Sequence, residues 1–237
     1  MVAMNSSFIF SVYVSIIIST LLVVPHVVDG AEFYSPDLPP TGVSLDDLIS
    51  KWWNWWHTVP SETALIWPSC LVSDGGSIGS NESVVFLANP SFGNDANTNR
   101  TNQNCQIFSN QAIFFPLYNS VCDTSMPEFA VVDYSSMLEC AKDANTEPNA
   151  EVYLNGTDIT ANSFEHYTSA PFKLVYADRN PYEDLPGNYT AVGGGIYLFL
   201  KPLPQGEHEL HYAYDRQIAS EKGDAKYKFT VTDPNIQ

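Results

Sequence analysis

Four of the five tryptophans of this chain lie within residues 52–56, which read WWNWW. Ser44 precedes them and is a good helix N-cap, and Asp47 places a carboxylate in the first turn, where the helix dipole favours negative charge. Pro60 follows them, and the residue before a proline is disfavoured in the α region. The pattern therefore predicts a helix over residues 44–58 that carries all four indoles.

At about 100° per residue, this helix has one wide apolar face. Trp52 and Trp56 fall at the centre of that face. Trp53 and Trp55 fall on its two edges, and His57 falls on the polar side beside Trp53. Because indole faces also stack on sugar rings and other flat ligands, Trp53, Trp55 and His57 are the candidate ligand-binding residues. The alternative is that all four tryptophans belong to the core of the protein, with the helix lying on a sheet.

Beyond this helix, the sequence is patterned mainly as short β-strands with turn signals between them. Strand-like runs occupy residues 83–88, 112–118, 151–154, 172–176, 196–200 and 226–232, and residues 203–214 begin as a turn and continue as a strand. The last run alternates cleanly, so Tyr227, Phe229 and Val231 are expected to face inward. Strands at this spacing predict a β-sandwich, Ig-like or jelly-roll-like, and 44% hydrophobic residues are enough to form its core.

Several other segments complete the predicted organisation. Apolar residues recur at helical spacing over residues 128–143, which predicts a second accessory helix. Residues 89–104 hold six asparagines and predict a long solvated loop, whereas Gly193-Gly194-Gly195 predicts a turn or bulge. Residues 31–43 carry three prolines and predict an extended arm, so the single β-sandwich domain is expected to span residues 44–237.

The N-terminal segment predicts export. Residues 8–28 contain no charged side chain, and the run is about as long as a bilayer-spanning helix, on the order of twenty residues. Gly30, with Val28 two positions before it, is a tolerable cleavage site. We therefore expect residues 1–30 to be a cleaved signal peptide, with a retained signal anchor as the alternative. The protein is then extracellular or at the cell surface, and contacts a membrane only if this segment stays uncleaved.

Export also fits the cysteines, because an even number in an oxidising compartment usually means disulfides. Four cysteines allow three pairings. We favour Cys70 with Cys105 and Cys122 with Cys140, because each pair closes a loop of moderate length. Four N-x-S/T sequons are candidate glycosylation sites: Asn81, Asn99, Asn155 and Asn188.

Charge and motifs exclude several functional classes. The chain has 27 Asp and Glu but only 10 Lys and Arg, which gives a net charge of −17. This charge repels phosphate groups and therefore excludes nucleic acid as a partner. No nucleotide-binding, nucleophile-elbow or EF-hand motif is present. His208 and His211 point to opposite faces of the strand predicted there, so they cannot bind one metal. We expect one to hydrogen-bond backbone near the turn at Gly206 and the other to face solvent; no cofactor is predicted.

Several blocks of the sequence, taken in order, resemble those of a known group of proteins. They are KWWNWWHTVP, VVFLANPSF, CQIFSNQAIFFPLYNSVC, MLECAKDA leading into EVYLNG, and GGGIYLFLKPLPQGEHELHYAYD with YKFTVT. Their order resembles an uncharacterised family of exported proteins and covers most of the chain after residue 30. The asparagine-rich segment stands where the family has glycines after FLA. The resemblance implies export and a β domain, and it implies no activity, substrate or cofactor.

The predicted function is a non-enzymatic, exported surface or glycan-binding module, with a glycan or a cell-envelope component as its partner. No catalytic residue is assigned. One alternative is a secreted hydrolase that uses carboxylates such as Asp178, Glu183 and Asp184, which lie in a polar loop. The other is a structural component of the cell envelope.

Overall fold

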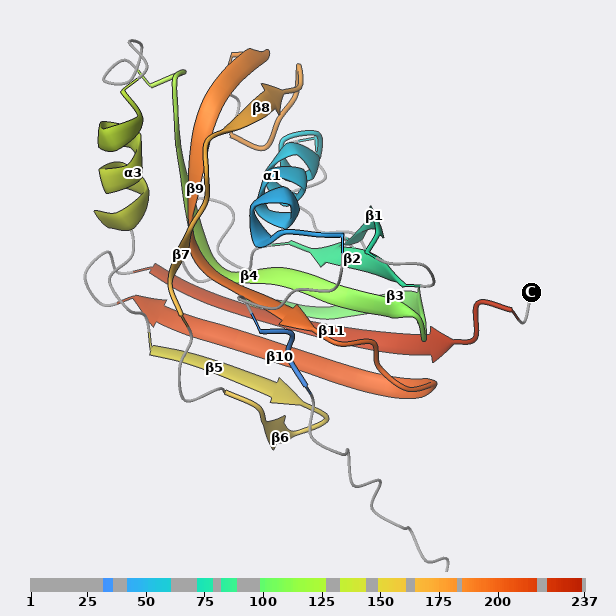
Figure 1. The fold of residues 1–237 in the computed structure, drawn as a ribbon. Helices are drawn as coiled ribbons and strands as arrows, with labels where there is room; N and C mark the ends of the chain where they lie inside the picture. The colour runs from blue at the N-terminus through green and yellow to red at the C-terminus, as the bar shows by residue number, and fades with distance from the viewer. Residues whose placement is uncertain are drawn as a thin grey trace, which may run out of the picture.

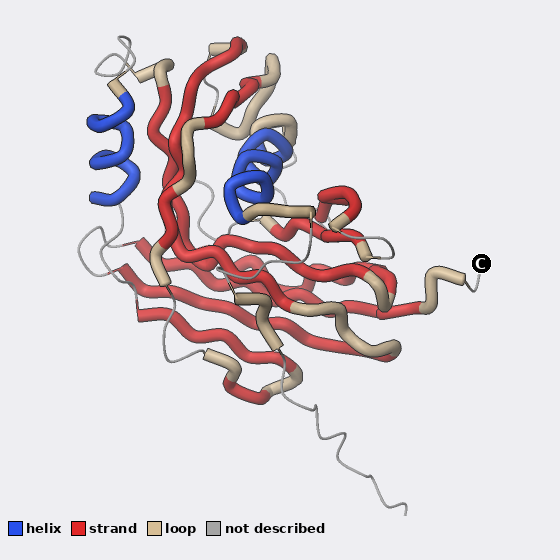
Figure 2. The backbone as a smooth tube through the Cα atoms, in the orientation of Figure 1, coloured by secondary structure: helices blue, strands red, loops and turns tan. Residues whose placement is uncertain are grey.

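The computed structural model describes residues 32–35, 42–60, 72–78, 82–88, 99–126, 133–143, 149–160, 165–182, 185–216 and 221–235. As predicted, the fold is mainly β. Two sheets and two helices form the described part, an arrangement compatible with a β-sandwich that carries accessory helices (Figures 1 and 2). Among the described residues, no helix is long and apolar enough to cross a membrane.

The first sheet has six strands, in the order β1-β2-β4-β9-β7, with β8 also paired to β9. Its strands are β1 (Val72–Ser77), β2 (Ser83–Leu87), β4 (Gln111–Asp123), β7 (Tyr167–Thr168), β8 (Phe172–Tyr176) and β9 (Gly187–Leu200). The β2–β4 pair is parallel and the others are antiparallel. The predicted strand at 172–176 has the observed bounds, whereas β4 and β9 extend well beyond the runs predicted for them.

The second sheet has five strands, in the order β3-β11-β10-β5-β6. Its strands are β3 (Asn99–Phe108), β5 (Asn149–Leu154), β6 (Thr157–Asp158), β10 (Gly206–Arg216) and β11 (Glu221–Thr232). Tyr227, Phe229 and Val231 are buried on the inner face, as their alternation predicts. Asn155 and Gly156 form the tight turn expected between β5 and β6, with φ values of 51° and 77°.

Strand β3 corrects the prediction of a solvated loop over residues 89–104. Residues 99–104 are part of the strand, and residues 89–98 lie outside the described part of the chain. The strand pairs in parallel with β11, and Cys105 and Ile107 are buried in the core. Backbone pairing with a partner far along the chain therefore outweighs the polar composition of this segment.

Strands β4 and β9 are long and bend sharply together, so their upper halves rise out of the sandwich (Figure 1). The register of this pair shifts between Pro116 and Tyr118 of β4. The glycine triplet predicted as a turn or bulge lies inside β9, opposite residues 119–121. Gly195 has a φ of 149°, a backbone conformation that favours glycine. The backbone of β4 also lies so close to Gly195 that a Cβ atom there would clash with it.

Helix α1 (Leu45–Trp56) is the predicted tryptophan helix, and it lies on the inner side of the bend (Figure 1). Ser44 caps its N-terminus and forms a capping box with Asp47. The apolar face packs into one core that includes residues from both sheets. Trp52 donates a hydrogen bond of 2.7 Å from Nε1 to the carbonyl oxygen of Leu87, which ties the helix to β2.

Helix α3 (Tyr134–Asp143) lies on the other side of the raised halves of β4 and β9 (Figures 1 and 2). It begins later than the predicted residue 128, and the side chain of Asp133 accepts a hydrogen bond of 3.1 Å from the backbone N–H of Ser135. Residues 127–132 lie outside the described part. The short polar side chain of Asp133 therefore caps the first turn of α3.

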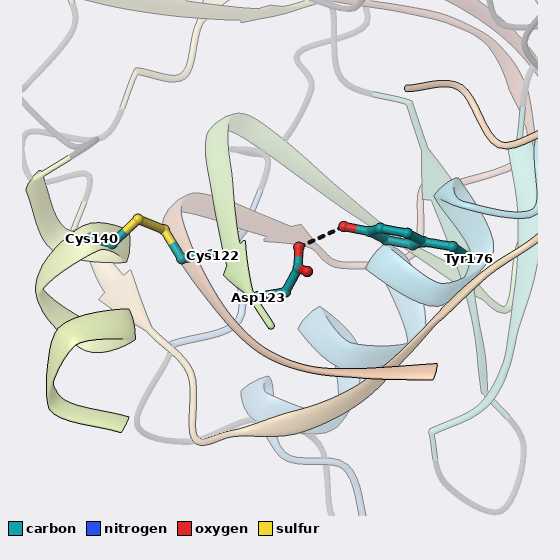
Figure 3. The surroundings of a disulfide bond; sticks show 4 residues. All are labelled: Cys122, Asp123, Cys140 and Tyr176. Carbon is teal, nitrogen blue, oxygen red and sulfur yellow. Dashed lines mark hydrogen bonds between the residues drawn. A yellow bond between two sulfur atoms is a disulfide. The ribbon is translucent and has the colours of Figure 1, made fainter. Parts of the chain in front are cut away.

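The disulfide Cys122–Cys140 joins the end of β4 to α3, as predicted (Figure 3). Met137, Ala141 and Val192 are buried around it in a small second core. Cys105 is also disulfide-bonded, and its predicted partner, Cys70, lies outside the described residues.

Residues 32–35 of the predicted arm pair with the end of β9 through a bridge between Phe33 and Leu200. The backbone N–H of Tyr34 donates to the carbonyl oxygen of Phe199 at 2.8 Å. The predicted signal segment, residues 1–30, lies outside the described residues.

Candidate functional site at the tryptophan helix

Three of the four indoles are core residues. Trp52, Trp53 and Trp56 are buried, with at most 2% of each side chain exposed. Their N–H groups are also satisfied, since Trp53 donates to the hydroxyl of Tyr197 at 3.1 Å and Trp56 to the hydroxyl of Tyr182 at 3.2 Å. Buried indoles with satisfied N–H groups stabilise the fold, and in this position none of the three can stack on a ligand.

Trp53 and His57 therefore lie inside the protein, so neither of these two candidate ligand-binding residues reaches solvent. His57 is completely buried, although the helical wheel places it on the polar side. Tyr176 stacks on its ring at 4.4 Å between centroids, and the ring of Tyr182 lies 5.2 Å away. Strand β8 and the residues after it cover this side of α1, and no local pattern in the helix indicates that cover.

Trp55 is the one indole of the run that keeps part of its surface exposed. Its ring packs between Trp56, at 6.0 Å, and Phe86, at 6.1 Å between centroids, and it also contacts Trp52. These neighbours fix the position of the ring, and the residue as a whole stays partly exposed. Of the three candidate residues, Trp55 alone is partly exposed.

The polar side of α1 covers the free edge of β8. The side-chain amide of Asn54 donates to the carbonyl oxygen of Lys173 at 2.9 Å and accepts from the backbone N–H of Val175 at 3.0 Å. One amide thus pairs with the strand as a neighbouring backbone would. Asp46 adds a bond of 2.9 Å from the backbone N–H of Ala170. The asparagine within WWNWW therefore satisfies a strand edge that would otherwise be open to pairing with another chain.

Replacing Asn54 with aspartate is expected to lower the free energy of unfolding by about 1–3 kcal/mol, because a carboxylate cannot donate to the carbonyl of Lys173. Urea denaturation followed by circular dichroism measures the change. Lys51→Ala, on the exposed side of the same helix, is the matched control and is expected to have little effect. Equal stability of the two variants would contradict the role given to Asn54.

A buried polar group connects the helix to the end of β4. Asp123 is fully buried and accepts a hydrogen bond of 2.5 Å from the hydroxyl of Tyr176 (Figure 3). It also accepts one of 2.7 Å from the backbone N–H of Ser125. Tyr176 in turn stacks on His57. Asp123, Tyr176 and His57 are residue types used in acid–base catalysis, and they lie close together here. All three are buried in the interior of the protein.

The ring of His57 is held in its neutral form. Its Nδ1 lies 2.8 Å from the carbonyl oxygen of Trp53, so Nδ1 carries the proton and donates. Its Nε2 is buried and has no hydrogen-bond partner within the described part of the chain. Burial lowers the pKa of His57 to about 4, against the smaller opposite effects of the bond to Trp53 and the charge of Asp123.

Stability is therefore expected to fall as the pH drops from 6.5 towards 4. In this window the unfolded chain protonates His57 and the folded chain does not, so acid favours unfolding by roughly 3 kcal/mol in total. Above pH 6.5 the contribution of His57 is constant. Urea denaturation across this pH range measures the slope, and His57→Phe is expected to make it shallower. Parallel pH curves for the two proteins would contradict this assignment.

The other predicted residues are spread over the structure. His208 hydrogen-bonds the carbonyl oxygen of Pro204 at 2.8 Å, as expected near Gly206, and His211 lies 3.2 Å from the carboxylate of Asp224. Asp178 is exposed, whereas Glu183 and Asp184 lie outside the described residues, as does Asn81. Three of the four sequons, at Asn99, Asn155 and Asn188, lie within the described ranges.

Sequence reasoning missed the residues that complete the surroundings of the helix: Asp123, Tyr176, Tyr182 and Tyr197. They come from strands and a loop far from α1 in the chain, and no spacing within the sequence links them to it.

Comparisons with known proteins add no functional assignment. No family model matches the chain, and no curated protein matches it. Two solved structures are similar in part. A solution structure of amebosin covers 57% of this chain and 99% of its own length, at 11% identity and a TM-score of 0.20. A structure of PbICP-C in complex with falcipain-2 covers 63% of this chain and 98% of its own length, at 13% identity and a TM-score of 0.24. Both TM-scores are too low to support a fold or a function.

Proposed function

We propose that this protein is an exported, non-enzymatic β-sandwich that binds a glycan through Trp55. The observation that carries the proposal is the partial exposure of Trp55 beside three buried tryptophans. An indole held by packing loses little conformational freedom on binding, so such a ring is a favourable surface for a sugar.

A second exposed aromatic ring supports this site. Tyr182 is 45% exposed and accepts the hydrogen bond from Trp56, whose ring also contacts Trp55. Trp55 and Tyr182 therefore both contact Trp56 at the C-terminal end of α1. Tyrosine and tryptophan offer an apolar face together with a polar edge, which matches the mixed surface of a sugar ring.

Export is the second part of the proposal. A disulfide between Cys122 and Cys140 is compatible with an oxidising compartment, and the uncharged N-terminal segment predicts a signal peptide. N-terminal sequencing of protein recovered from the culture medium tests this step. A start near Ala31 supports cleavage, whereas an intact N-terminus in the membrane fraction contradicts it.

Replacing Trp55 with alanine is expected to weaken glycan binding by at least about tenfold, because a central aromatic contact contributes on the order of 2 kcal/mol. A glycan panel identifies the ligand, and calorimetric titration of the wild type and the variant measures the change. The matched control is Tyr134→Ala, which removes another exposed aromatic ring, 44% exposed, at the start of α3. Unchanged affinity in Trp55→Ala, or no binding of any glycan by the wild type, contradicts the proposal.

A further inference from the structure

Two of the four sequons have side chains that the structure describes, and their surroundings differ. Asn155 lies in the turn between β5 and β6, and Asn188 lies near the start of β9. Both residues are exposed. N-linked glycosylation requires that the amide nitrogen of asparagine be free to carry a sugar, so the hydrogen bonds of each amide distinguish the two positions.

The amide of Asn155 is occupied at both ends. Its nitrogen lies 3.0 Å from Nδ1 of His208, and its oxygen accepts from the backbone N–H of Glu209 at 2.8 Å. His208 also bonds the carbonyl oxygen of Pro204, so the three groups form one chain of hydrogen bonds across the turn. A sugar on this nitrogen would compete with the bond to His208.

The amide of Asn188 is not engaged in this way. The side chain points away from the core, and it makes no hydrogen bond to any residue that the structure describes. The backbone N–H of Thr190, the third residue of the sequon, is held by the hydroxyl of Thr124 at 3.1 Å. The sequon is thus fixed by strand pairing while its asparagine amide stays open to solvent.

Two exposed apolar residues are near Asn188, one across the strand pair and one along the chain. Val175 is the cross-strand partner of Asn188 and is 39% exposed, and Leu185, three residues before it, is 79% exposed. Directly paired residues on neighbouring strands lie on the same face of a sheet, within about 5.5 Å of each other. A sugar attached to the amide nitrogen of Asn188 would lie against the Val175 side chain and reduce its contact with water.

We propose that Asn188 carries an N-linked glycan whose first sugars lie over Val175 and Leu185, and that Asn155 serves the fold instead. The modification joins the amide nitrogen of Asn188 to C1 of a sugar supplied by a polyprenyl-diphosphate-linked oligosaccharide. The bond from C1 to the diphosphate breaks, and the amide nitrogen loses one proton. This inference rests on the export part of the proposed function, because that transfer takes place in the secretory pathway.

The test is expression of the full chain in cells whose secretory pathway performs N-glycosylation, followed by glycopeptide mass spectrometry of protein from the medium. We expect the peptide with Asn188 to be modified, and Asn188→Gln to lose that glycan without losing thermal stability. The matched variant Asn155→Gln is expected to keep the glycan and to melt at a lower temperature. Thr157→Ala destroys the sequon at Asn155 but keeps its amide, so it is expected to change neither mass nor melting beyond the substitution itself.

Secreted protein with an unmodified Asn188 peptide would overturn the proposal, whereas protein that never reaches the medium would instead contradict export. A separate experiment tests whether the glycan covers the side chains of Val175 and Leu185. Enzymatic removal of N-glycans from the native protein is expected to increase binding of a fluorescent hydrophobic dye. The double substitution of Val175 and Leu185 by serine is expected to abolish that increase. An increase that persists in the double variant, or none in the wild type, would overturn the position given to the sugars.

Discussion

Gly195→Ala is expected to lower the free energy of unfolding by about 3 kcal/mol or more. The residue has a φ of 149°, and a Cβ atom there would lie 2.3 Å from the carbonyl oxygen of Tyr118 and 2.7 Å from Cα of Asn119. Both contacts are backbone atoms of β4, which is paired to β9 and cannot give way without disturbing that pairing. Chemical denaturation followed by circular dichroism measures the loss.

Gly206→Ala is the matched control for this substitution. Gly206 also has a positive φ, of 135°, but a Cβ atom there meets nothing within 4 Å. This variant therefore shows the effect of backbone conformation alone, on the order of 1–3 kcal/mol. The additional loss in Gly195→Ala reports the close approach of the two strands, and equal losses would contradict it.

Trp52→Ala is expected to destabilise the protein by about 3–5 kcal/mol, because a fully buried indole leaves a large cavity. The carbonyl oxygen of Leu87 also loses its donor, which adds to the loss if that oxygen stays buried. Trp52→Phe keeps most of the volume but removes the N–H, so the difference between the two variants isolates the packing contribution. The same denaturation measurement applies to both.

Trp55→Ala is the matched comparison for the loss of stability measured in Trp52→Ala. Both residues are tryptophans of one helix, but Trp55 is only half-buried and makes contacts along part of its ring. Its loss of stability is expected to be clearly smaller than that of Trp52→Ala. Equal losses would show that Trp55 is as much a core residue as its neighbours, and would remove its place in the binding site.

Local signals in the sequence predicted local structure well. Features that depend on near neighbours in the chain are all present in the structure. They are the helix cap at Ser44, the carboxylate of Asp47 in the first turn, and the inward-facing alternation of Tyr227 and Phe229. The fold class follows from the same signals, because the strands and turns are repeated at short spacing. The predicted pairing of Cys122 with Cys140 is also present.

Long-range contacts account for what the sequence did not predict. His57 lies on the predicted polar side of the helix, yet it is fully buried in the structure. Strand β8, which covers it, is more than a hundred residues away in the chain; Asn54 and Lys173, which are hydrogen-bonded, are 119 residues apart. Strand β3 depends on its parallel partner β11, and Gly195 on the approach of β4. Periodicity within one segment contains no information about which distant segment covers it.

Oxidative footprinting of the native protein, with mass spectrometry of each tryptophan, separates the indoles that hold the fold from the one proposed to bind a ligand. We expect Trp55 to be modified rapidly, and to be protected when a glycan from the panel is bound. Trp52, Trp53 and Trp56 are expected to react only on unfolding, because all three are buried. Modification of Trp53 as fast as that of Trp55, or labelling of Trp55 that a bound glycan leaves unchanged, would contradict this division of the tryptophan helix.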